Sequence, residues 1–148
     1  MTAHPATTTA AARPRLAPDG PALPTAAGFD DAVDALARAI WHHARADSVR
    51  AMEAVACCVR NRRAAAGHTA SLPDLVRAEF LPPSGPARSV TSADPLFAVA
   101  LRIARRALAG QIADPTLGAT RLHAAADTPA WAEGLAPLAT VGGLVFHA

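Results

Sequence analysis

Histidine side chains are the first candidates for chemistry in this 148-residue chain, because imidazole can bind a metal ion or transfer a proton near neutral pH. Four of them, His42, His43, His123 and His147, could in principle converge on one site. His42 and His43 are adjacent, however, and adjacent residues on a helix point about 100° apart. The sequence contains no H-x-x-x-H or C-x-x-C pair of the kind that binds zinc. We therefore expect neither a metal site nor a cofactor.

The basic residues and the cysteines favour structural roles. All 14 basic residues are arginines and the formal net charge is +2, which is too small to indicate a polyanionic partner. Arg60, Arg62 and Arg63 form a dense basic run without interleaved aromatic residues, so we expect them to support structure rather than to bind nucleic acid. Cys57 and Cys58 are neighbours, which suits neither a disulfide nor a metal pair. We expect both in or beside the core.

Two consecutive helices should position His42 and His43. After Asp30 the apolar residues recur at helical spacing, with Asp30 or Asp31 as the expected N-cap. The stripe consists of Val33, Leu36, Ala37, Ile40, Trp41 and Ala44. A second helix is predicted from Ser48, and the break at Gly67 ends it.

The rest of the chain predicts further helices and a small β element at the C-terminus. In order, these are a short helix from Ser71 to Phe80, a loop over 82–86, the longest helix from Pro95 to Gly110, a turn over 114–118, and extended segments over 119–123 and 140–147, separated by a turn that carries Trp131. Residues 1–28 are rich in Ala, Thr and Pro without any period. We predict a disordered lead-in over 1–28 and one mainly α (α+β) domain over 29–148.

Three separated blocks of this sequence resemble the SleB-type cell wall hydrolase family, the spore cortex-lytic enzymes. The matching residues are Ala44, Arg45, Ala54, Val55, Ala56, Val59, Asn61 and Arg62; then Phe80, Asp114, Pro115, Thr116, Gly118, Ala119 and His123; then Trp131, Val141, Gly142 and Phe146. They follow the family's order and spacing from about residue 30 to residue 148. The resemblance implies a small lysozyme-like domain that acts on the glycan strands of peptidoglycan as a muramidase or lytic transglycosylase.

Such an enzyme needs one glutamic acid, because the leaving glycosidic oxygen must receive a proton as the bond breaks. In this sequence the position of that glutamate is His43. Ala46 and Asp47 replace the motif's next Gly and Glu, and Leu144 replaces the His of the terminal motif. Imidazole has an ordinary pKa of about 6.5 and is a poor substitute, because a cation would repel an oxocarbenium-like transition state.

Another carboxylate could take over the role of the acid. Of the three glutamates, Glu79 is the strongest candidate, because the resemblance places it before Phe80 near the substrate groove. The Glu53 side chain is expected to lie in solvent, beside the apolar stripe of the second helix. Asp47 could cap that helix or contact substrate. His43 and Glu79 are thus the candidate catalytic residues.

The resemblance also implies substrate-binding positions, which are Asp47, Phe80, His123 and Trp131. Trp131 is expected in the core or on the rim of the groove, with sugar stacking as a further role. Two hypotheses stay open: a peptidoglycan glycosidase or lytic transglycosylase working through Glu79 or His43, and a catalytically silent relative that binds glycan strands or serves a structural role in a larger assembly.

The expected partner is therefore peptidoglycan, with no nucleic acid and no membrane. The sequence shows neither the roughly 18 apolar residues of a membrane span nor the apolar stretch of a secretory signal. We expect a protein that stays cytoplasmic until its release, or that reaches the cell wall through lysis or in a phage-like particle.

Overall fold

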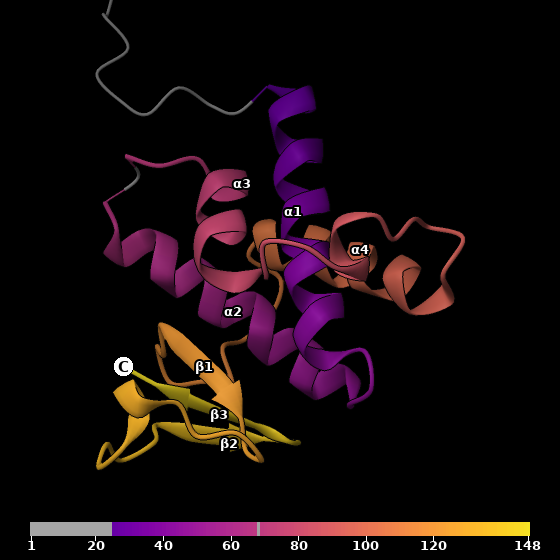
Figure 1. Ribbon diagram of the computed structural model, residues 1–148. Helices are drawn as coiled ribbons and strands as arrows, with labels where there is room; N and C mark the ends of the chain where they lie inside the picture. The colour runs from indigo at the N-terminus through magenta and orange to yellow at the C-terminus, as the bar shows by residue number, and fades with distance from the viewer. Residues whose placement is uncertain (1–24, 68) are drawn as a thin grey trace, which may run out of the picture.

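Helix α1 (Ala26–Ala44) lies at the centre of the helical part and contacts each of the other helices (Figure 1). The computed structural model describes residues 25–67 and 69–148. The predicted apolar stripe of α1 is buried as expected. Its expected N-cap is wrong, because Thr25 caps the helix by accepting a hydrogen bond from the Gly28 amide, and Asp30 instead forms an ion pair with Arg105.

The folded part therefore begins earlier than expected. The prediction that the lead-in extends to residue 28 is wrong for Ala26–Gly28, which form the first turn of α1. Alanine has the highest helix propensity of all residues, and a capping threonine in front of two alanines is enough to start the helix there. The remainder of the predicted lead-in, residues 1–24, lies outside the described residues.

Helix α2 (Val49–Ala65) begins at the predicted place, with Ser48 as its N-cap. The Ser48 side chain accepts from the Ala51 amide at 3.1 Å. Cys57 and Cys58 are free and buried, as expected. Burial raises the pKa of Cys57 to about 11 and that of Cys58 to about 12, so both are inert thiols that fill the core.

Helix α3 (Leu72–Leu75) continues into the π-helical turn η1 (Val76–Phe80), and together they form the predicted short helix. Ser71 caps α3, and both parts pack against α1. The predicted loop over 82–86 follows and leads into one 3₁₀ turn, η2 (Pro86–Arg88). This arrangement brings the end of η1 beside the last turn of α1.

Helix α4 (Pro95–Leu108) starts at the predicted cap, where Asp94 accepts hydrogen bonds from the Leu96 and Phe97 amides. The chain leaves it at Gly110, which has the positive φ of 73° that favours glycine. With 14 residues against 19 in α1, it is not the longest helix, so that prediction is wrong. Helix α2, with 17 residues, is longer than α4 as well.

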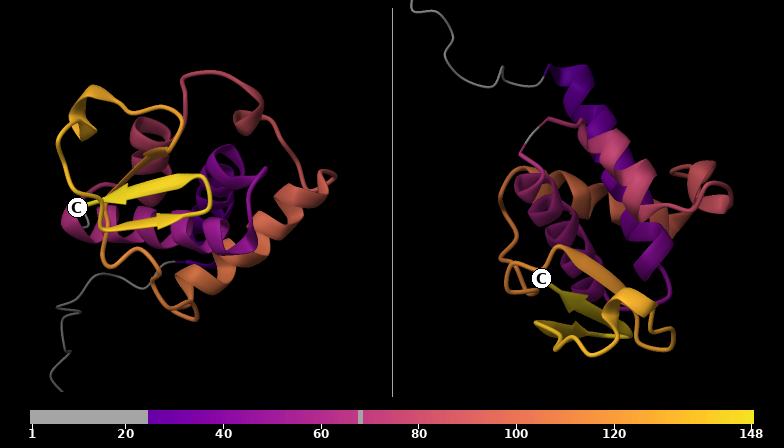
Figure 2. Two further views of the ribbon diagram at one scale, coloured as in Figure 1. Left: turned by 90° about the horizontal axis from the view of Figure 1, so that it is seen from below. Right: turned by 60° about the vertical axis from the view of Figure 1, so that its left-hand side comes forward.

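The C-terminal part forms a three-stranded antiparallel sheet in the order β1–β3–β2, at one end of the helices (Figures 1 and 2). Its strands are β1 (Arg121–Ala124), β2 (Ala139–Val141) and β3 (Leu144–His147). The expected single extended segment over 140–147 is wrong, because a turn at Gly142 makes it a hairpin. Trp131 lies in the 3₁₀ turn η3 (Ala130–Ala132), as the predicted turn requires.

These elements confirm the predicted mainly α class with a small C-terminal β element. The sheet contacts α2 through β1 and β2. Within the described ranges, no helix combines the length and the apolar character needed to cross a membrane.

Candidate functional site

A hollow of about 200 Å³ lies where α1, η1 and β1 meet, and we call it the His43 hollow. Its walls are His43, Glu79, Phe80, Thr120, Arg121, Leu122 and Trp131. Four residues that the sequence predicted for a site therefore line one concave surface, although they come from three distant parts of the chain.

His43 lies in the last turn of α1 with its ring against η1. Its Nε2 is 2.9 Å from the carbonyl oxygen of Phe80. A carbonyl only accepts hydrogen bonds, so Nε2 carries the proton and donates it. Burial and the neighbouring His42 lower the pKa of His43 to about 4, although the hydrogen bond to Phe80 opposes the shift. The ring is therefore neutral near pH 7, and its single proton is already engaged.

Glu79 is held by an arginine of α2. Its Oε2 accepts from Arg62 Nε at 2.7 Å, and its Oε1 accepts from Arg62 Nη2 at 3.0 Å. This bidentate geometry is the strong form of a carboxylate–guanidinium pair. Neither oxygen can carry a proton toward a bound sugar unless the pair opens. The pair also joins α2 to η1 and so fixes one wall of the His43 hollow.

Asp47 does not line the His43 hollow, and the expectation that it caps α2 is wrong. Its Oδ2 accepts from the Gly143 amide and its Oδ1 from the Ser48 amide, both at 2.7 Å. These hydrogen bonds lower the pKa of Asp47. A Cβ atom added at Gly142, where φ is 58°, would overlap the Asp47 carboxylate. Asp47 therefore joins the α1–α2 corner to the turn of the hairpin, while Ser48 provides the cap.

A second hollow adjoins the first and contains His123, so we call it the His123 hollow. It measures about 360 Å³ and shares Leu122 and Trp131 with the His43 hollow. Trp131 is 39% exposed and stands between the two. The structure thus places His123 next to the other predicted site residues, in a neighbouring concavity.

His147, which the sequence analysis considered only as a possible metal ligand, is a further member of this cluster. It is buried, and its Nε2 lies 3.0 Å from Nε2 of His123, whose Nδ1 is 2.8 Å from the Ala124 carbonyl oxygen. His123 must donate from Nδ1 to that carbonyl, so in the neutral pair His147 donates from Nε2. With the His147 proton on Nε2, the Nδ1 atom of His147 is buried and has no hydrogen-bond partner among the described residues.

The register of the sheet explains how these side chains meet. Arg121 pairs with His147 and His123 with Val145, so all four share one face. Both imidazole rings meet the Trp131 ring edge-on, at centroid distances of 5.7 and 5.4 Å, and the Arg121 guanidinium lies over it at 5.3 Å. The period-two spacing of 121, 123, 145 and 147 was the sequence signal for this face. The shared face could be recognised only once the pairing of β1 with β3 was known.

Asn61 holds the loop that leads into β1. Its Nδ2 donates to Asp114 Oδ2 at 2.8 Å and to the Ala119 carbonyl at 3.0 Å. Asp114 also accepts from Thr116 and from Gly118. Although burial opposes it, the hydrogen bonds from Thr116 and Asn61 lower the pKa of Asp114. The contacts of Asn61 and of Arg62 agree with a structural role for this part of α2, whereas Arg60 and Arg63 form no ion pair among the described residues.

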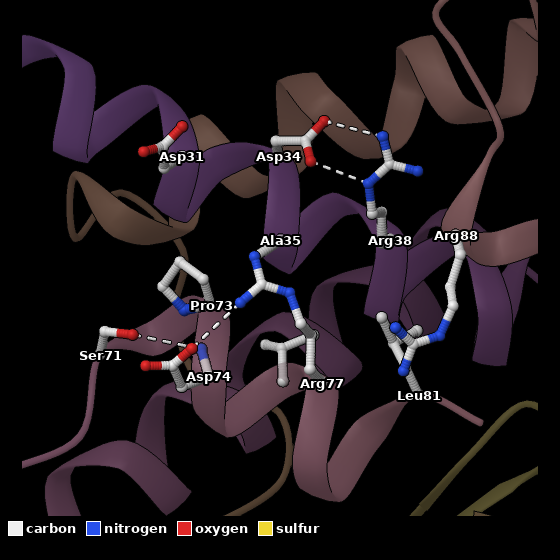
Figure 3. A pocket seen from close by; sticks show the side chains of 11 residues that line it. Asp31, Asp34, Ala35, Arg38, Ser71, Pro73, Asp74, Arg77, Leu81 and Arg88 are labelled. Atoms are coloured by element: carbon white, nitrogen blue, oxygen red, sulfur yellow. Dashed lines mark hydrogen bonds and ion pairs between the residues drawn. The ribbon is translucent and has the colours of Figure 1, made fainter. Parts of the chain in front are cut away.

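A larger hollow of about 440 Å³ lies between α1 and α3 (Figure 3). Its acidic and basic side chains pair with each other, as Asp34 does with Arg38 and Asp74 with Arg77. None of the predicted site residues lines it. Because its charges are largely balanced internally, it is a weaker candidate than the His43 hollow.

Across the part of the chain that the structure describes, no three His, Cys, Asp or Glu side chains are grouped so that they could hold a metal ion. No protein-family model, curated protein or solved structure matches this chain.

Proposed function

We propose that this protein binds the glycan strands of peptidoglycan along the His43 and His123 hollows and does not cleave them. The observation that carries the proposal is the hydrogen bonding of the His43 side chain. Its side chain lies in the wall of a concave site where the family resemblance implies the acid, but its only proton is donated to the Phe80 carbonyl.

The two hollows suit an extended saccharide. They adjoin each other, and the half-exposed Trp131 ring between them offers an apolar face of the kind that packs against the C–H face of a sugar. Thr120 and Arg121 add a hydroxyl and a guanidinium to the rim, which can hydrogen-bond to sugar hydroxyl and N-acetyl groups. The combination of polar groups with an aromatic face matches the hydroxyl groups and C–H faces of a saccharide.

Cleavage lacks a free proton donor in this arrangement. His43 is neutral near pH 7, and both Glu79 oxygens accept hydrogen bonds from Arg62. General acid catalysis typically contributes about 10² to 10⁴ in rate. A site without it retains the means to bind a glycan but loses most of the means to cut one.

The test is co-sedimentation of the purified protein with insoluble peptidoglycan, together with a turbidity assay on the same material. We expect binding without clearing. Trp131→Ala should weaken binding about tenfold, since an aromatic contact is worth about 0.5–1.5 kcal/mol beyond its buried area. Leu135→Ala is the matched control, because Leu135 is also an exposed apolar side chain on the segment after η3 and lines neither hollow.

Two results would overturn the proposal. Failure of the wild-type protein to sediment with peptidoglycan would remove the binding function. Clearing by the wild-type protein that disappears in Glu79→Gln would show that the chain is a hydrolase or lytic transglycosylase working through Glu79.

A further inference from the structure

A separate concave site lies near the C-terminal end of α2, where this helix meets α3 and α4. It measures about 280 Å³, and we call it the Arg63 hollow. Its walls are Arg60, Asn61, Arg63, Ala64, Leu72 and Leu108. It shares no residue with the His43 or His123 hollows, so the proposed glycan site does not account for it.

The arginines of this basic run differ in their partners. Arg62 pairs with Glu79, whereas Arg60 and Arg63 form no ion pair within residues 25–67 and 69–148. The acid of this region, Asp114, already accepts hydrogen bonds from Asn61, Thr116 and Gly118. Two guanidinium groups therefore line one hollow without a counter-charge.

Arg63 is also partly removed from water. Its Nε is buried and has no hydrogen-bond partner among the described residues. The attraction between opposite charges is stronger where solvent is partly excluded. Arg63 consequently gains more from a bound anion than a fully exposed arginine would.

We propose that the Arg63 hollow binds a single oxyanion, a carboxylate or a phosphate monoester, carried on a short aliphatic chain. The guanidinium groups of Arg60 and Arg63 match the geometry of an oxyanion. Leu72 and Leu108 provide an apolar wall for the chain that carries it. The lining, taken over the described residues, contains no aromatic ring on which a base could stack, so a small amphiphilic anion fits better than a nucleic acid.

The test is calorimetric titration of the full chain with hexanoate, hexyl phosphate and inorganic phosphate, with hexylamine as the ligand of opposite charge. We expect both hexyl anions to bind, hexyl phosphate to bind more tightly than inorganic phosphate, and hexylamine not to bind. The two hexyl anions distinguish a carboxylate from a phosphate as the preferred group. Arg63→Gln and Arg60→Gln should each weaken binding of the preferred anion about tenfold.

Arg102→Gln is the matched control, because Arg102 is an exposed arginine of α4 that lines none of the hollows. Arg63 also lies in the last turn of α2, where a cation stabilises the helix dipole, so thermal unfolding of each free variant separates that contribution from ligand binding. The proposal is refuted if neither hexyl anion binds, or if Arg102→Gln weakens binding as much as Arg63→Gln. Tighter binding of a single-stranded oligonucleotide than of hexyl phosphate would also refute it and would indicate a nucleic-acid surface.

Discussion

Replacing His43 with glutamate should restore lytic activity, if the hollow is intact and only the acid is missing. A carboxyl group at position 43 would lie beside the Phe80 carbonyl, which can accept a hydrogen bond but cannot donate one. Burial and that acceptor both favour the protonated carboxyl, which raises its pKa toward the range that a general acid needs. A neutral imidazole that gave up its Nε2 proton would become an imidazolate, whereas a carboxylic acid becomes an ordinary carboxylate, so only the carboxyl can turn from the Phe80 carbonyl and protonate a substrate oxygen. The gain expected from such an acid is about 10² to 10⁴ in rate, which corresponds to about 3 to 5 kcal/mol of barrier.

The assay compares clearing of a peptidoglycan suspension and release of soluble saccharides by the wild-type protein, His43→Glu and His43→Gln. Glutamine is the control, because its amide can keep the hydrogen bond to the Phe80 carbonyl but cannot act as an acid. We expect clearing by His43→Glu alone. A folded His43→Glu protein that sediments with peptidoglycan but releases nothing above the His43→Gln level would refute the inference that position 43 faces the scissile bond.

Three further predictions concern stability. The pKa of His43 is lowered to about 4 in the folded protein, so as the pH falls the imidazole is protonated in the unfolded chain before it is protonated in the folded one. The free energy of unfolding should therefore drop by about 3 kcal/mol between about pH 6.5 and pH 4. Urea titrations over this range should show a smaller drop for His43→Gln. Asn61→Ala removes the hydrogen bonds to Asp114 and the loop carbonyl and should cost about 2 kcal/mol in the free energy of unfolding; an unchanged urea midpoint would contradict this. Gly142→Ala forces a positive φ and a collision with Asp47, at a cost of about 1–2 kcal/mol from the backbone alone; the penalty should shrink in an Asp47→Ala background, and strict additivity would show that the two residues do not meet.

The helices could be predicted well because their signals are local. The apolar stripe of α1, the Ser48 and Asp94 caps and the Gly110 stop all act within a few residues of one another. The start of α1 was missed because Thr25 follows an Ala- and Pro-rich stretch in which apolar residues do not recur at helical spacing. The hairpin was missed although Gly142 and Gly143, two glycines between apolar residues, are a local signal of a two-residue turn.

The site was partly predictable, for a similar reason. The family resemblance indicated His43, Glu79, Phe80 and Trp131, which line one hollow. It could not show that Arg62 occupies both Glu79 oxygens, because this contact spans 17 residues of sequence. The contact of Asp47 with Gly143 spans 96 residues, and no local pattern encodes a pairing of that length.

The most direct test of glycan binding uses Trp131 as its own reporter. In a Trp41→Phe background, Trp131 is the only tryptophan, and peptidoglycan glycan strands freed of their stem peptides can be titrated against its fluorescence. We expect a saturable shift of the emission to shorter wavelength, because a sugar packed on the exposed ring excludes water from it. An emission spectrum that stays unchanged at saturating glycan, in a folded protein, would contradict the claim that this ring lies in a saccharide site.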